Sequence, residues 1–85
     1  MIIRSAANVM VMEEFLLDTI NEIRSLKGAE KIDHLSPEMN LRDDLGLSSF
    51  DLAELTVKIE DEYDIDIFED GLVNTVGEIL SKFAE

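Results

Sequence analysis

The chain has 85 residues, of which 46% are hydrophobic and none is cysteine, and it carries a formal net charge of −13 at pH 7. This length predicts one domain with a limited core, and the lack of cysteine excludes a disulfide framework and a thiolate metal site. The acidic balance argues against nucleic acid as a partner, because its phosphates would be repelled, and favours basic partners.

The N-terminus lacks a targeting or membrane-spanning pattern. No apolar run approaches the ~20 residues needed to cross a bilayer, and the first eight residues become polar after Ile3, unlike the apolar region of a secretory signal. We therefore expect a cytoplasmic protein without stable membrane association. Residues 1–9 are expected to form a flexible extension, and residues 10–85 a single domain.

Apolar residues recur at helical spacing in the first part of the chain, with acidic residues largely between them. They are Met12, Phe15, Leu16, Ile20, Ile23 and Leu26. The pattern predicts an amphipathic helix over residues 10–26. Lys27 and Gly28 form a suitable stop, because they place a cation near the last carbonyls and then a residue that tolerates left-handed geometry.

Residues 28–48 form a long connection that contains the chain's one proline, Pro37, and has no regular hydrophobic period. Loops of this length are uncommon inside compact domains and are often functional. Regular apolar residues predict that this loop is held against the helices: Ile32, Leu35, Met39, Leu41, Leu45 and Leu47. A short helical turn is predicted over residues 41–45.

A second amphipathic helix is predicted to begin at Ser48 or Ser49 and to end at about Tyr63. Ser48 and Asp51 have the spacing of a capping box, in which the serine caps the helix and the acidic residue returns a hydrogen bond. Ser49 then lies in the first turn and faces solvent. An anion is favoured there by the exposed N–H groups and the helix dipole. A serine beside a helix start is nevertheless usually a plain cap.

The last third of the chain predicts shorter elements. Ile65 and Ile67 alternate with aspartates, but no partner strand is predicted, so an extended linker is preferred. Residues 68–73 are predicted to contain a short helical turn. Thr75 and Glu78 again have capping-box spacing and introduce a C-terminal helix with the apolar residues Val76, Ile79, Leu80 and Phe83. The expected fold is all-α, a small four-helix bundle with three main helices, one short helix and a long first loop.

Two other chemistries fit the sequence poorly. Nucleophilic catalysis by Ser49 would need a base within hydrogen-bond reach, but the one histidine, His34, lies in the long loop, and no nucleophile elbow surrounds the serine. Residues 60–71 are rich in carboxylates, yet the fifth and sixth positions of an EF-hand loop would fall on Phe68 and Glu69. We therefore expect neither enzyme activity nor a metal site.

The run Asp44-Leu45-Gly46-Leu47-Ser48-Ser49-Phe50-Asp51 resembles the attachment motif of the acyl carrier proteins and, more broadly, of phosphopantetheine-attachment carrier domains. Helix order, loop length and acidity extend the resemblance over residues 10–84. The family motif is commonly Asp-Ser-Leu with the serine modified. By that match Ser49 is the attachment residue, while Ser48 and Phe50 replace the usual Asp and Leu.

The resemblance implies a carrier protein, not an enzyme. A phosphopantetheinyl transferase would move 4′-phosphopantetheine from coenzyme A to Ser49, and its thiol would carry acyl groups as thioesters. Acidic residues would dock basic patches on acyl-transferring, condensing or reducing enzymes: Asp51, Glu54, Glu60 and Asp61. The bundle would shelter the acyl chain among apolar residues, for which the lining candidates are Leu41, Leu45, Leu47, Val57, Ile59 and Ile67.

Fatty acid biosynthesis by a monomeric carrier is the expected role. Two alternatives stay open. One is a specialised carrier for a polyketide, peptide or lipid-modification pathway, which the replacements at Ser48 and Phe50 permit. The other is an unmodified acidic helical module that binds partners without a cofactor.

Overall fold

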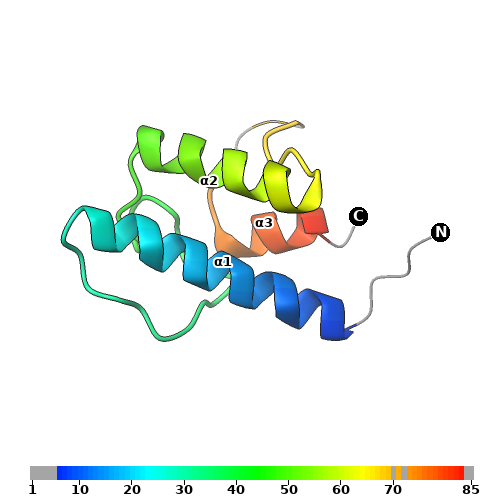
Figure 1. Cartoon of the computed structure of the whole chain (residues 1–85), viewed down its shortest axis with the longest axis horizontal. Coiled ribbons are helices and arrows are strands. Elements are labelled where there is room, and N and C mark those ends of the chain that lie inside the picture. The colour runs from blue at the N-terminus through cyan, green and yellow to red at the C-terminus, as the bar shows by residue number, and fades with distance from the viewer. Residues whose placement is uncertain (1–5, 70, 72, 84–85) are drawn as a thin grey trace.

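The computed structural model describes residues 6–69, 71 and 73–83, and this part of the chain is all-helical (Figure 1). Its helices are α1 (Ala6–Leu26), α2 (Ser49–Tyr63) and α3 (Val76–Phe83). Helices α1 and α2 run side by side in opposite directions, and the short α3 packs against α1 (Figure 1). The all-α prediction is confirmed.

The fourth helix of the predicted bundle is not found within the described residues. Residues 67–69 form a turn instead, and two positions of the predicted segment, 70 and 72, lie outside the described part. Helix α2 ends at Tyr63, and Asp64 caps it in a left-handed conformation with φ of 56°. Residues 64–66 are neither helix nor strand, which agrees with the predicted linker.

Helix α1 begins earlier than the hydrophobic pattern predicts. Its first residue is Ala6, so the second half of the predicted N-terminal extension is helical, whereas residues 1–5 lie outside the described part. Alanine has the highest helix propensity, and Ala6 and Ala7 extend the helix beyond its amphipathic section. The predicted end is confirmed, because the helix stops at Leu26 and Gly28 follows with φ of 79°.

One hydrophobic core joins the three helices and the loops. Its fully buried members include Leu16, Ile20, Leu55, Ile59, Val76, Ile79 and Phe83. Aromatic rings connect the helices near the end of α2, where Tyr63 lies 5.2 Å from Phe15 of α1 and 5.4 Å from Phe83 of α3, measured between ring centroids. Such edge-on and tilted contacts add to the apolar burial.

The long connection between α1 and α2 is held against the core, as predicted. Leu41, Leu45 and Leu47 are buried, and other apolar side chains of the loop pack on the core. The side-chain amide of Asn21 in α1 is also buried, donates to the Ile32 carbonyl at 2.9 Å and accepts from the Ile32 N–H at 2.8 Å. The loop is therefore tied to α1 by polar as well as apolar contacts.

The same loop is tied to the start of α3. The Gly77 N–H donates to the Pro37 carbonyl at 2.9 Å, and a Cβ on Gly77 would lie 3.0 Å from that oxygen. Glycine therefore allows the loop and α3 to approach this closely. The predicted cap of α3 is confirmed: the Glu78 N–H donates to Thr75 Oγ1 at 3.2 Å, and the Thr75 N–H donates to Glu78 Oε1 at 3.1 Å.

Candidate functional site

The site is built at the N-terminus of α2, where the predicted capping box is confirmed. The Asp51 N–H donates to Ser48 Oγ at 3.2 Å, and the Ser48 N–H donates to Asp51 Oδ2 at 2.9 Å. Ser48 is the N-cap in extended conformation, and Ser49 is the first residue of the helix. Ser49 is exposed and is not needed for the cap, so its hydroxyl is accessible from solvent.

Cations at the end of α1 position the segment that leads to Ser49. Lys27 Nζ donates to Asp51 Oδ2 at 2.5 Å and to the Gly46 carbonyl at 2.8 Å. Arg24 donates to the Leu45 carbonyl at 2.5 Å through Nη1. Gly46 has φ of 69°, a conformation that a residue with a Cβ adopts with strain. These contacts fix the turn from which α2 starts.

The carboxylate of Asp51 is committed to these contacts. The pKa of Asp51 is held below its ordinary value of 3.8. The hydrogen bond from the Lys27 side chain is the largest cause, and the hydrogen bond from the Ser48 backbone is the next. Asp51 was predicted to cap the helix and to dock partners, and the structure gives it the first role. Of the predicted docking residues, Glu54, Glu60 and Asp61 are exposed and form no ion pair within the described part of the chain.

We expect Asp51→Asn to lower the free energy of unfolding at pH 7 and to have a much smaller effect at about pH 2. Because the folded-state pKa of Asp51 is lowered, its ionised form stabilises the fold above pH 3.8, and this contribution is lost as the pH falls through the lowered folded-state value. Urea unfolding followed by circular dichroism measures the difference, with Asp61→Asn as the exposed control. An equal effect of Asp51→Asn at both pH values would contradict an ionic role.

Arg42 lies beside Ser49. Its Nη2 donates to Ser49 Oγ at 3.0 Å, and both residues line a cavity of about 440 Å³ between α2 and the segment that precedes α3. The other lining residues are Leu52, Ala53, Thr56, Phe68, Val73 and Asn74. The cavity therefore has apolar walls and several polar lining residues, Ser49 and Arg42 among them.

None of the six predicted acyl-pocket residues lines this cavity. Leu41, Leu45, Leu47, Ile59 and Ile67 are instead buried in the core. Val57 is 64% exposed, so the prediction that it lines an interior pocket is wrong. Val57 lies on the outward face of α2.

Phe50 also lies on the surface, and its side chain is 87% exposed. Phe50, Glu54, Val57 and Asp61 are spaced three or four residues apart along α2 and therefore share one helix face. We call these four residues the outer stripe of α2. It presents two apolar and two acidic side chains to solvent.

The structure places His34 away from the serine. His34 lines a different hollow with Met10, Glu13, Glu14, Leu17, Asp33 and Leu35, which include residues of α1. Within the described part of the chain, no imidazole or carboxylate hydrogen-bonds Ser49 Oγ, and the group that does is a guanidinium donor. A donor cannot remove the hydroxyl proton, so the arrangement does not activate Ser49 as a nucleophile.

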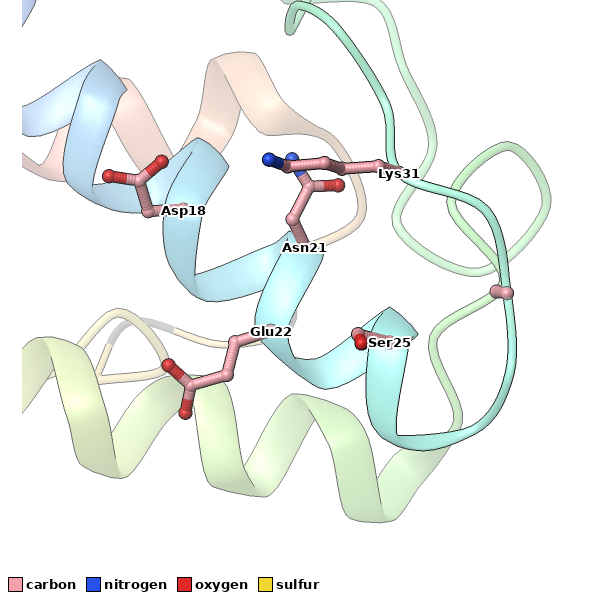
Figure 2. A pocket seen from close by; sticks show the side chains of 6 residues that line it. Asp18, Asn21, Glu22, Ser25 and Lys31 are labelled. Carbon is pink, nitrogen blue, oxygen red and sulfur yellow. The ribbon is translucent and has the colours of Figure 1, made fainter.

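Another hollow, of about 400 Å³, lies between the second half of α1 and the loop that follows it (Figure 2). Figure 2 shows the Lys31 side chain directed from the loop toward α1, whereas Glu22 points toward α2. Glu22 accepts an ion-pair hydrogen bond from Lys58 of α2 at 3.2 Å. This hollow is mostly polar in its lining and includes neither Ser49 nor Arg42.

No described helix is long and apolar enough to cross a membrane.

The exposed Ser49 at the first residue of α2 of an acidic helical domain is the arrangement that the resemblance to carrier domains predicts. The family model described as "Phosphopantetheine attachment site" matches residues 14–81. A protein named acyl carrier protein from Picosynechococcus sp. is 37% identical over 76 residues, covering 87% of this chain and 94% of that protein. One from Exiguobacterium sibiricum is 32% identical over 74 residues, covering 85% and 92%.

No solved structure gives a significant match. The chain belongs to the phosphopantetheine-attachment family, the family of the acyl carrier proteins. It is a carrier protein and not an enzyme, and the cofactor of its family is a covalently attached phosphopantetheine. Acyl carrier proteins interact with a phosphopantetheinyl transferase and with acyl-handling enzymes.

Two site residues were missed by the sequence pattern. Arg42 stands seven positions before Ser49, and Lys27 was interpreted as a helix stop rather than as a partner of Asp51. The chain has only seven Lys and Arg residues against 20 Asp and Glu residues, so a cation near the motif is itself a signal for an ionic contact there. Which acidic or polar group each one meets depends on the loop path.

Proposed function

We propose that the protein carries acyl intermediates as thioesters on a 4′-phosphopantetheine arm attached to Ser49, in fatty acid biosynthesis. The observation that carries this proposal is the division of roles between the paired serines. Ser48 supplies the cap through its hydroxyl, and Ser49 presents an exposed hydroxyl on the first residue of α2. A monomeric cytoplasmic protein is part of the proposal.

The residues around Ser49 fit a phosphate-linked group. The N-terminus of α2 and the Arg42 guanidinium both favour negative charge next to the hydroxyl, and the adjacent cavity is large enough for part of an extended arm. In the transfer, Ser49 Oγ would bond to the phosphorus that bears pantetheine in coenzyme A while the bond to adenosine bisphosphate breaks. The serine proton would pass to a base of the transferase.

When bound, the arm supplies a terminal thiol that carries acyl groups as thioesters. We propose the cavity beside Ser49 as the nearest shelter for the first part of an acyl chain, with Leu52, Phe68 and Val73 as its apolar walls. The buried residues that the sequence predicts as acyl-pocket lining would then support this shelter from their positions in the core.

The test is an intact-mass measurement after incubation of the wild-type protein with coenzyme A, Mg²⁺ and a broad-specificity phosphopantetheinyl transferase. The expected result is a mass gain of one phosphopantetheine. No gain would contradict the carrier proposal and favour the unmodified interaction module. A loaded protein can then be offered to fatty-acid and polyketide enzymes, because the exposed Phe50, in place of the usual Leu, favours a specialised partner set as the second candidate.

We propose that partner enzymes dock on the acidic surface of α2 through Glu54, Glu60 and Asp61. Exposed ion pairs contribute about 0.2–1 kcal/mol each. Reversing two charges in Glu54→Lys/Asp61→Lys is therefore expected to slow loading at low salt by roughly twofold to thirtyfold. The difference should shrink at about 1 M salt, where the Debye length is only about 3 Å.

The matched control is Glu13→Lys/Glu14→Lys, which makes the same charge change on the exposed surface of α1. This control should load faster than the α2 variant at low salt. Equal rates for the two double variants would show that net charge, and not a docking site on α2, governs the encounter.

A further inference from the structure

We propose that Arg42 is a positioning residue that holds the phosphate of the Ser49-linked arm by a charge-assisted hydrogen bond, an inference that rests on the proposed function. The Arg42 Nη2 atom lies 3.0 Å from Ser49 Oγ. In the modified protein the phosphorus is bonded to that same oxygen. The non-bridging phosphate oxygens are therefore within reach of the guanidinium after a small side-chain movement.

Arg42 is available for this contact because, within the described residues, its guanidinium donates to no group other than Ser49. Lys27 and Arg24, the nearby cations at the end of α1, are engaged by a carboxylate and by backbone carbonyls. A guanidinium has five N–H donors, so Arg42 retains donors for a phosphate.

The charge of the chain makes such a contact valuable. The formal net charge is −13, and attachment of the arm adds a further negative charge at the phosphodiester. Arginine pairs with phosphate through a planar fork of donors, which fixes orientation as well as charge. Because Arg42 also lines the cavity beside Ser49, a phosphate held by Arg42 places the start of the arm next to this cavity.

The test compares the modified wild-type protein with modified Arg42→Gln, Arg42→Lys and Lys31→Gln. The last variant removes the same charge from an exposed residue that lines a different hollow. Intact mass first establishes that each protein carries one arm on Ser49. The ³¹P NMR signal of the phosphodiester is then followed between about 0.1 M and 1 M NaCl, over which the Debye length falls from about 10 Å to about 3 Å.

We expect the wild-type and Lys31→Gln signals to shift with salt as the pairing is screened. The Arg42→Gln signal should resemble that of a free phosphodiester at every salt concentration, and Arg42→Lys should lie between them. Identical chemical shifts and salt dependence in wild type and Arg42→Gln would overturn the role of Arg42 while leaving the carrier function intact. Absence of a mass gain in the wild-type protein would instead overturn the proposed function.

A second measurement needs no Arg42 variant. In ¹⁵N-labelled wild-type protein, the Nε–H signal of Arg42 is compared before and after modification, with Ser49→Ala treated in parallel. We expect this signal to shift on modification in the wild type and to stay unchanged in Ser49→Ala. An Arg42 signal that is the same in the unmodified and modified wild-type proteins would overturn the inference even if Arg42→Gln failed to load.

Discussion

Ser49→Ala is expected to abolish loading by phosphopantetheine while leaving the free energy of unfolding within about 0.5 kcal/mol of wild type. The Ser49 side chain is exposed, and its one hydrogen bond within the described part is to the exposed Arg42. Alanine is well tolerated in the first turn of a helix. Intact mass measures the loading, and urea unfolding followed by circular dichroism measures the stability.

Ser48→Ala is the matched control, since it makes the same substitution one residue earlier. It removes the cap of α2, so we expect a loss of about 1 kcal/mol in the free energy of unfolding and a retained mass gain. The two variants thus separate the structural serine from the modified one. A mass gain that persists in Ser49→Ala would move the attachment to another residue, and Ser48 would be the first to examine.

Among the proposed variants, Leu16→Ala is expected to lower the free energy of unfolding the most, by about 2–5 kcal/mol. Leu16 is 0% exposed in the middle of α1, and its truncation leaves a cavity in the core shared by all three helices. At about 0.05–0.15 kcal/mol per residue, a domain of 85 residues has a total stability of about 4–13 kcal/mol, and the loss is a large fraction of it. The variant is therefore expected to be largely unfolded at moderate urea concentration or on mild heating.

Leu26→Ala is the control for this experiment, because it removes the same atoms from the same helix. Leu26 is 78% exposed, and we expect its replacement to change the free energy of unfolding by less than about 0.5 kcal/mol. Thermal and urea unfolding of both variants provide the comparison. Equal effects of the two substitutions would contradict the burial pattern of α1.

The helix ends were predictable because their signals are local. Ser48 with Asp51 and Thr75 with Glu78 form the hydrogen bonds that their spacing predicts, and Gly28 follows the end of α1. The early start of α1 at Ala6 was missed, because propensity rather than amphipathicity extends the helix there. The short fourth helix was predicted from a weak pattern, and residues 67–69 form a turn.

The surroundings of Ser49 were less predictable. Val57 is expected to line the acyl pocket, yet it is exposed together with Phe50 on the outer stripe of α2. Hydrophobicity indicates that a side chain gains from burial, but which side chains of a helix are buried depends on the face that the neighbouring helices cover. The contacts of Arg42 and Lys27 depend in the same way on the path of the long loop.

The sequence by itself determined the helical class, the acidic surface, the two caps and Ser49 as the serine not required for capping. Each of these follows from composition or from residues within a few positions of one another, where local hydrogen bonds suffice. The tertiary structure alone decided that Arg42 reaches the Ser49 hydroxyl, that Lys27 pairs with Asp51 and that a cavity opens beside the serine. Packing of the common core brings together segments distant in the chain, such as those of Lys27 and Asp51 and those that line the cavity. Arg42 and Ser49 stand seven positions apart, and the packed path of the loop between them decides their contact.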